Sequence, residues 1–229
     1  MQSIRENVTD IDLVDQWIIV DDHTPARYHT RVKQALDWVS VPVEWIWKTT
    51  EPRGHAHSMN LLRERAQYAD YVFHWEDDWK VFIPDRYVTR LIQGLQRFPH
   101  LGQILINEHY REQTHHPHYT TIEGGIPLDD HVIQHVWNPH DMRVGAFYWP
   151  HYSLRPGMQR GSLWNIVGPY DEHHAHFELE YANRYFHTHG FQTGFLKGIH
   201  AKHLGKCTWE SEQSHPSAYA LNNVTRFEQ

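Results

Sequence analysis

Apolar segments alternate with amphipathic ones along the chain, in an order that predicts strands and helices in turn. Short runs rich in β-branched and aromatic residues predict strands at 17–20, 43–48, 71–75, 103–107, 131–137 and 191–196. The spacing of apolar residues predicts helices that begin after Pro25, at about 55–68, after Pro84, and at about 175–187. This alternation predicts an α/β fold with a mostly parallel, mixed sheet covered by helices on both faces.

The chain is expected to form a single domain, residues 1–229. Its length suits one substantial core, and no Ser/Gly/Pro-rich linker or low-complexity tract divides it. Between 112 and 150 the periodicity fades into His, Pro, Gly and Asp residues, apart from the strand at 131–137. We interpret this segment as long surface loops, where substrate specificity is often determined.

Composition and charge narrow the class of protein. The formal net charge of −7 argues against a nucleic-acid partner or an anionic membrane surface. The apolar runs are too short to span a bilayer and the first residues lack a signal-peptide pattern, so a soluble, cytoplasmic protein without a transmembrane segment is expected. The lone Cys207 excludes an internal disulfide framework and a cysteine-based zinc site.

Histidine is unusually frequent, with 22 residues, but its spacing does not match a zinc hydrolase. No His-Glu-x-x-His sequence occurs, and the His55/His57 pair lacks a following Asp at ligand spacing. Most of these histidines are therefore interpreted as solvated or hydrogen-bonded side chains.

The strongest chemical signal lies at 71–82, where an apolar strand ends in Glu76, Asp77 and Asp78. Open α/β sheets bind ligands at the carboxyl ends of their strands. Adjacent carboxylates raise one another's pKa, so a fold that holds them together usually supplies a cation. Mg²⁺ or Mn²⁺ fits such oxygen ligands and commonly bridges substrate phosphates. The alternative is an acidic turn that caps the next helix.

The order of motifs resembles that of the family 2 type of nucleotide-sugar glycosyltransferases, which have the GT-A fold. The matching elements are Val20-Asp21-Asp22 after a strand, Gly54-x5-Asn60 at a helix start, Glu76-Asp77-Asp78, Tyr170-Asp171-Glu172, Phe177-Glu178-Leu179-Glu180-x3-Arg184, and the late His203. The resemblance covers nearly the whole chain. Its end, at 217–222, also resembles a subgroup of these transferases found in viruses and some bacteria.

The resemblance implies a role for each matching residue. Asp21 or Asp22 would hold the nucleotide base, and Glu76, Asp77 and Asp78 occupy the place of the family's Asp-x-Asp motif. Asp78 would be the main metal ligand and His203 the second. Glu178 would be the catalytic base, whereas Lys48 and Asn60 would contact the nucleotide sugar. Taken alone, Glu178 would be an exposed helical acid and His203 a surface histidine. Glu180 is as well placed to pair with Arg184, four residues on, as to touch substrate.

These roles imply an inverting, divalent-metal-dependent transfer of a sugar to a glycan or another hydroxyl acceptor. Mn²⁺ or Mg²⁺ would neutralise the nucleotide diphosphate leaving group. A carboxylate on the opposite side would take the proton of the acceptor hydroxyl. This single displacement is the transfer counterpart of an inverting glycosidase. Two other classes stay open: a two-carboxylate glycoside hydrolase, and a transferase relic that binds nucleotide or glycan without turnover.

Two features depart from the family pattern. The family's first strand has no counterpart, and only residues 3–8 match the helix that follows it. In the family this strand lies between the strands at 17–20 and 71–75, so its loss would expose two inner edges of the sheet. A simple gap is not expected to persist, because unpaired backbone groups there cost about 1–3 kcal/mol each. We expect the sheet to close up, to recruit another segment or chain, or to remain marginally stable and prone to aggregate. A chain extended upstream by roughly fifteen to twenty-five residues is expected to melt higher and bind nucleotide more tightly. Arg155 stands where a small polar residue is expected, so the acceptor pocket should differ.

Overall fold

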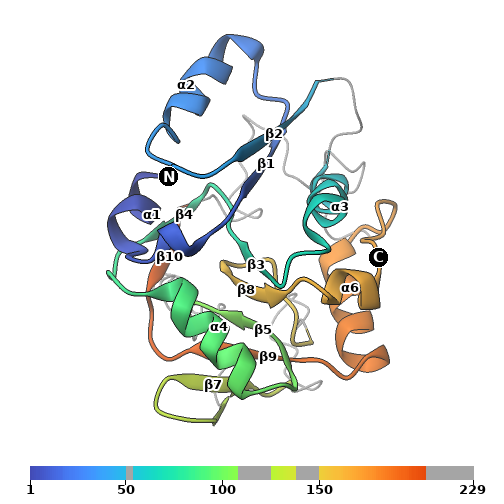
Figure 1. The fold of residues 1–229 in the computed structure, drawn as a ribbon. Helices are drawn as coiled ribbons and strands as arrows, with labels where there is room; N and C mark the ends of the chain where they lie inside the picture. The colour runs from blue at the N-terminus through green and yellow to red at the C-terminus, as the bar shows by residue number, and fades with distance from the viewer. Residues whose placement is uncertain (50–53, 108–124, 138–149, 205–229) are drawn as a thin grey trace.

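The structure, a computed structural model, describes residues 1–49, 54–107, 125–137 and 150–204. Near the N-terminus, β1 (Trp17–Asp22) and β2 (Val43–Lys48) form a parallel pair. The connection between them contains the 3-10 turn Ala26–Tyr28 and α2 (His29–Gln34). The pair lies at one end of the molecule, with α2 beside it (Figure 1).

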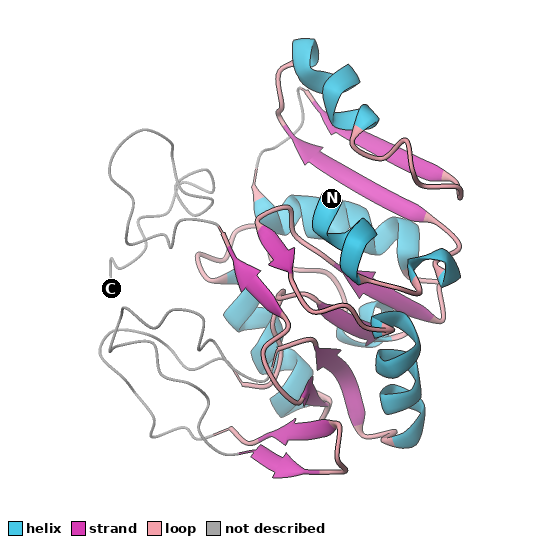
Figure 2. Cartoon of the chain, turned by 90° about the vertical axis from the view of Figure 1, so that its left-hand side faces the viewer, coloured by secondary structure: helices cyan, strands magenta, loops and turns pink. Residues whose placement is uncertain are grey.

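The main sheet has six strands in the order β3-β8-β5-β9-β7-β6. Their bounds are β3 (Tyr71–His74), β8 (Gly157–Arg160), β5 (Leu101–Leu105), β9 (Gln192–Leu196), β7 (Val132–His135) and β6 (Gly125–Pro127). A separate antiparallel pair joins β4 (Trp79–Val81) to β10 (Ala201–His203) (Figure 2). Strands β4, β6, β8 and β10 were not predicted, and β6 lies in the segment that was expected to form loops. All four are three or four residues long, too short for an alternating apolar pattern to emerge.

The predicted mixed α/β architecture is confirmed, although fewer strands run parallel than the alternation predicted. Among the described ladders, β1–β2 and β5–β9 are parallel, whereas the others are antiparallel. The difference comes from β8 and β7. Both belong to the part of the chain after β5, and each is inserted antiparallel beside β5 or β9.

Two hydrophobic cores hold the helices against the sheets. One contains α1 (Gln2–Asn7), which contacts β4, and α4 (Tyr87–Arg97), which packs on β5 with side chains such as Leu91, Leu95 and Ile104. The other contains α3 (His55–Ala66), α5 (Leu163–Val167) and α6 (Phe177–Asn183), which continues into a π-helical turn, Arg184–Thr188. Within the described ranges, no helix is both long and apolar enough to cross a membrane.

Within the described residues, β1 and β3 belong to separate sheets, and the sheet does not close up between them. In the described part of the chain, β1 pairs only with β2 and β3 only with β8, so no ladder joins the two sheets. The apolar residues of these two strands, such as Ile19 and Phe73, are only partly buried. Helix α3 packs against β1 and also contributes to the core beside β3, which connects the two sheets without a strand between them.

Candidate active site

The ends of β1 and β2 place an acid beside a buried lysine. Asp22 and Lys48 are register partners, and Lys48 Nζ lies 3.0 Å from Asp22 Oδ1. Lys48 is 1% exposed and also donates to the Gly54 carbonyl (3.2 Å) and to Ser58 Oγ (2.9 Å). Burial raises the pKa of Asp22, but hydrogen bonds from Lys48, Gly54 and His23 outweigh it, so the pKa is lowered. This carboxylate is therefore ionised, and its partners fix its position.

The backbone around Asp22 adopts conformations that suit a preformed site. The Gly54 N–H donates to Asp22 Oδ2 (3.0 Å) from a backbone with φ of 118°, which favours glycine. His23 has φ of 76°, rare for a residue with a side chain, and its Nδ1 lies 3.0 Å from Asp22 Oδ1. Asp21 Oδ1 accepts the N–H of Thr24 (2.8 Å). Strained backbone of this kind concentrates at functional sites.

The acidic segment after β3 shows the electrostatic crowding that its sequence predicts. Burial raises the pKa of Glu76 to about 8, and the negative charges of Asp78 and Glu178 act in the same direction. Burial and the charge of Asp78 also raise the pKa of Asp77. The negative charges of Asp78 and Glu178 therefore both make ionisation of Glu76 less favourable.

The two predicted metal ligands meet although they are far apart in sequence. The β4–β10 ladder pairs Trp79 with His203, which brings His203 Nε2 to 2.8 Å from Asp78 Oδ2. The second carboxylate oxygen of Asp78, Oδ1, is buried and has no hydrogen-bond partner in the described residues. Within the same residues, no group of three or more His, Cys, Asp or Glu side chains is placed to hold a metal ion. The chain thus offers one oxygen and one nitrogen ligand here, a donor set that suits Mn²⁺.

Glu178 lies in the first turn of α6, where a carboxylate is stabilised by the helix dipole. Its Oε1 accepts the Leu154 N–H (2.9 Å) and the Ser153 hydroxyl (3.2 Å). The helix is anchored by Tyr181, whose ring stacks on that of Tyr170 at 4.2 Å. The structure therefore orients the predicted base from two sides, and its catalytic role stays a prediction.

His55, which was not predicted to belong to the site, lies beside its acidic segment. Its Nε2 is 3.3 Å from Glu76 Oε1, and its ring meets that of Phe177 edge-on at 5.2 Å. Burial lowers the pKa of His55 to about 4, although the charges of Asp78 and Asp22 oppose this shift. The imidazole is therefore neutral at pH 7. The sequence feature that could have pointed to His55 is its position directly after Gly54, at the start of α3.

Asn60 has a structural role that the sequence analysis did not predict. Its amide donates to the Tyr170 carbonyl (3.0 Å) and to Glu172 Oε1 (2.7 Å), and its oxygen accepts the Tyr170 N–H (2.8 Å). His57 Nδ1 lies 3.0 Å from the same carboxylate of Glu172. Helix α3 thus holds the 170–172 segment in place. The predicted contact between Asn60 and a nucleotide stays a prediction.

Asn60→Ala is expected to lower the free energy of unfolding by about 2–4 kcal/mol, because several buried polar groups lose their partners at about 1–3 kcal/mol each. Urea unfolding measures the change. Asn165→Ala is the matched control, because Asn165 is exposed and donates a single hydrogen bond, to the Gln67 carbonyl. Equal stability of the two variants would contradict this role of Asn60.

Arg155, expected to change the acceptor pocket, is buried behind the proposed base. It is 8% exposed, its Nε donates to Ser153 Oγ (3.3 Å), and its guanidinium lies 5.6 Å from the centre of the Phe195 ring. Since Ser153 also donates to Glu178, Arg155 supports the base through Ser153.

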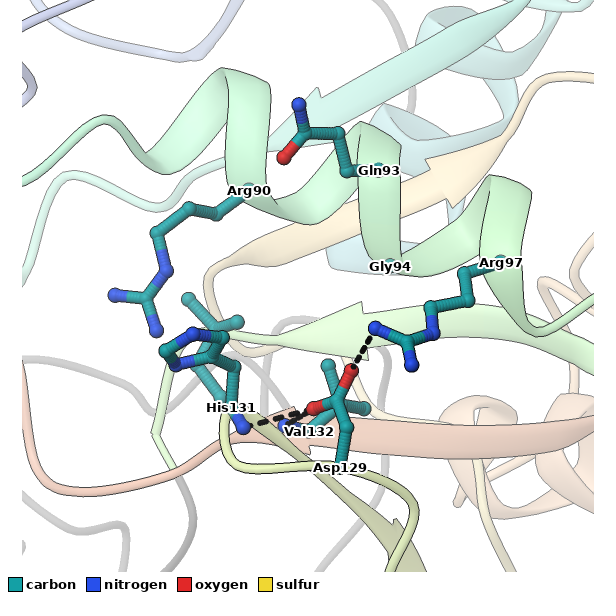
Figure 3. A pocket seen from close by; sticks show the side chains of 8 residues that line it. Arg90, Gln93, Gly94, Arg97, Asp129, His131 and Val132 are labelled. Atoms are coloured by element: carbon teal, nitrogen blue, oxygen red, sulfur yellow. Dashed lines mark hydrogen bonds and ion pairs between the residues drawn. The ribbon is translucent and has the colours of Figure 1, made fainter.

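A small cavity of about 110 Å³ lies between α4 and the turn that leads into β7 (Figure 3). It shares no lining residue with the acidic cluster. Its charged groups pair locally: Arg97 with Asp129 at 3.2 Å, and Arg90 with Asp85. Asp129 also accepts the backbone N–H groups of His131 and Val132. These pairs leave little charge to attract a ligand, so the acidic cluster is the candidate site.

The architecture, with acids gathered at strand ends, is that of the GT-A class of α/β folds. A solved structure with a similar fold is the crystal structure of GalNAc-T7 with UDP, GalNAc and Mn²⁺, at a TM-score of 0.56 and 11% sequence identity. The match covers 88% of this chain and 39% of that one. No known family profile matches the sequence, and no curated protein matches it. The predicted fold class is thereby confirmed, whereas the predicted subgroup stays a prediction.

Proposed function

We propose that this chain is a nucleotide-sugar glycosyltransferase that transfers a sugar, with inversion and with the help of a divalent metal ion, to a hydroxyl acceptor. The observation that carries this proposal is the pairing of Asp78 with His203, 125 residues apart in sequence, whose Nε2 lies 2.8 Å from Asp78 Oδ2. Glu76, two residues before Asp78, lies 3.3 Å from His55. The His55 ring meets that of Phe177, the residue before the proposed base Glu178. The GT-A fold supports the proposal independently.

The nucleotide is proposed to bind at the ends of β1 and β2. Asp21 and Asp22 lie there, and Asp22 is held by Lys48 and the Gly54 N–H. Lys48 contributes by fixing Asp22, because its ammonium already contacts Asp22, Gly54 and Ser58. Fixed polar groups of this kind need no reorganisation when a ligand binds, which favours affinity.

Asp78 and His203 are proposed to hold Mn²⁺ or Mg²⁺ beside the diphosphate. When bound, the ion neutralises the charge that develops on the leaving diphosphate. The buried, unpartnered Oδ1 of Asp78 supports this assignment, because such an atom normally has a partner. GalNAc-T7 was crystallised with UDP and Mn²⁺, which supports the choice of ligand class.

Glu178 is proposed to take the proton of the acceptor hydroxyl. The hydroxyl oxygen attacks the anomeric carbon as the bond between that carbon and the diphosphate oxygen breaks, so the anomeric configuration inverts. The Leu154 N–H and the Ser153 hydroxyl hold the carboxylate in one orientation. A glycan is one such acceptor.

Binding of a nucleotide diphosphate is expected to require the metal ion. Calorimetry with UDP and with GDP, each with Mn²⁺ and with excess EDTA, measures this. Asp78→Asn should weaken binding at least about tenfold by removing a charged ligand, equivalent to about 1.4 kcal/mol. Asp37→Asn, at an exposed position, is the matched control.

Equal nucleotide affinity in EDTA would remove the metal role, and no binding of UDP or GDP under either condition would contradict the proposal. Cleavage of a glycan without any nucleotide sugar would favour the glycoside hydrolase. Nucleotide binding without turnover would favour the non-catalytic relic.

A further inference from the structure

Strand β10 carries the proposed metal ligand His203 but forms only a short ladder. It pairs with β4 over three residues, Ala201–His203, and belongs to no larger sheet among the described residues. His203 Nε2 nevertheless lies 2.8 Å from Asp78 Oδ2, a contact that tolerates little displacement. A two-stranded ladder of this length is marginally stable on its own, so further contacts must hold β10 in place.

The side chain of Asn107, two residues after β5, supplies such contacts. Its Oδ1 accepts the N–H groups of His200 (2.8 Å) and Ala201 (2.9 Å), and its Nδ2 donates to the Ala201 carbonyl (2.7 Å). Asn107 is 3% exposed and Ala201 is fully buried. One side-chain amide thus pairs with both backbone groups of Ala201, as a neighbouring strand would.

These hydrogen bonds satisfy the edge of β10 that faces away from β4. The Phe82 N–H donates to the His200 carbonyl (3.0 Å), so this carbonyl faces β4. Successive residues of an antiparallel strand present their backbone groups to opposite edges, so those of Ala201 face the other way. Buried backbone groups without partners are unfavourable, so the amide of Asn107 stabilises β10 in this position.

Helix α4 holds the same segment from a second direction. The Tyr87 hydroxyl lies 3.2 Å from His200 Nδ1, and the two rings meet edge-on with centres 5.6 Å apart. His200 Nε2 lies 3.0 Å from the Lys197 carbonyl oxygen. Strand β10 therefore starts from a fixed point. At a rise of about 3.3 Å per residue, His203 lies about 7 Å along the strand from Ala201.

We infer that Asn107 is a positioning residue for the metal site, which sets the place of His203 beside Asp78 by fixing the start of β10. This inference rests on the proposed function, in which Asp78 and His203 hold the divalent ion. Loss of a group that orients a metal ligand typically lowers metal affinity about 10- to 100-fold. Asn107 acts in this way through the backbone of β10.

Electron paramagnetic resonance of added Mn²⁺ measures its affinity for the whole chain and for each variant. Asn107→Ala should weaken Mn²⁺ binding at least about tenfold. Gln103→Ala is the matched control, because Gln103 lies on β5, is 2% exposed, and donates to the carbonyl and accepts the N–H of Ser153, at 2.7 and 3.2 Å. It holds a different segment, so its loss should leave Mn²⁺ affinity within about twofold of wild type. Equal losses of affinity in the two variants would overturn the inference.

A double-mutant cycle separates positioning from general destabilisation. In the His203→Ala background, Asn107→Ala should change Mn²⁺ affinity by less than about twofold, because the ligand that Asn107 positions is gone. The same loss in both backgrounds would overturn the inference.

Asn107→Asp takes the place of Asn107→Ala in the cycle if the alanine variant does not fold. Its carboxylate can still accept both N–H groups but cannot donate to the Ala201 carbonyl. The effect of its charge is common to both backgrounds and cancels. Relative to its parent, this variant should again bind Mn²⁺ more weakly in the wild-type background than in the His203→Ala background, and equal effects would overturn the inference.

Failure of the inference and failure of the proposed function give different results. Wild-type protein that binds Mn²⁺, with no loss of affinity in Asn107→Ala, would overturn the inference alone. Wild-type protein that binds no Mn²⁺, with or without UDP or GDP, would overturn the proposed metal role as well.

Discussion

Glutamine in place of Glu178 is expected to lower turnover by roughly two to four orders of magnitude, the scale of losing a general base. The amide oxygen of glutamine can still accept the Leu154 N–H that Glu178 Oε1 accepts, so the fold and the nucleotide site should persist. Steady-state kinetics measure the loss of turnover. Calorimetry measures the affinity for the nucleotide diphosphate, which should stay within about twofold of wild type because only a proton acceptor is lost.

Glu180→Gln is the matched control on the same helix. The carboxylate of Glu180 pairs with Arg184 through two oxygens, at 2.5 and 2.8 Å, and Arg184 also donates to the carbonyls of Val167 and Pro169. This variant should lose some stability but retain turnover. Normal turnover in Glu178→Gln would mean that another carboxylate is the base, and Asp171, Glu172 and Glu180 are the candidates.

The regular elements could be predicted from the sequence because their signals are local. The strand at 43–48 and the start of α3 at His55 were predicted where the structure places them, since apolar periodicity and Gly54 mark them. The helix predicted at 175–187 is α6 followed by a π-helical turn. Periodicity cannot distinguish these two helix types, because their hydrogen-bond registers differ by only one residue.

The candidate site was only partly predictable because its contacts join distant segments. The structure places His203 against Asp78, 125 residues away, and the metal-binding role that the order of motifs implied for both residues stays a prediction. The hydrogen bonds between Asn60 and Tyr170, 110 residues apart, depend on packing that no local pattern encodes. His55 was overlooked because a histidine at a helix start is usually solvated, and only the fold places it against Glu76.

A steep loss of stability below pH 6.5 is expected from three buried histidines. Burial lowers the pKa of His74 to about 3, of His135 to about 2 and of His151 to about 4. These residues are 9%, 2% and 5% exposed, and the rings of His135 and His151 are 4.6 Å apart. All three stay neutral in the folded protein while the unfolded chain takes up protons near pH 6.5.

The sign follows from this difference in bound protons. The contribution of the neutral histidines to the free energy of unfolding is fully present above pH 6.5. It falls as the pH drops, by about 1.4 kcal/mol per pH unit for each extra proton on the unfolded chain. Glu76 acts in the opposite direction, because its folded pKa is raised to about 8 and its protonation favours the folded state at lower pH. Down to pH 4.5, the ordinary pKa of its side chain, Glu76 offsets the effect of roughly one histidine on stability. His55, whose pKa is lowered to about 4, acts in the same direction as the three buried histidines. Four histidines, less the one that Glu76 offsets, give a net loss of about 4 kcal/mol per pH unit, large against a typical total of about 5–15 kcal/mol.

Urea unfolding of wild type and His135→Gln at pH 7.5, 6.0 and 5.0 tests this expectation. Because glutamine does not titrate, the slope of stability against pH should be smaller in His135→Gln by about 1.4 kcal/mol per pH unit, whatever its stability at pH 7.5. His173→Gln, at an exposed position, should keep the wild-type slope. Comparing slopes cancels the contribution of Glu76, which both proteins share. An unchanged slope in His135→Gln would mean that His135 is not held neutral by burial in the folded protein, and the acid sensitivity would then have to arise elsewhere.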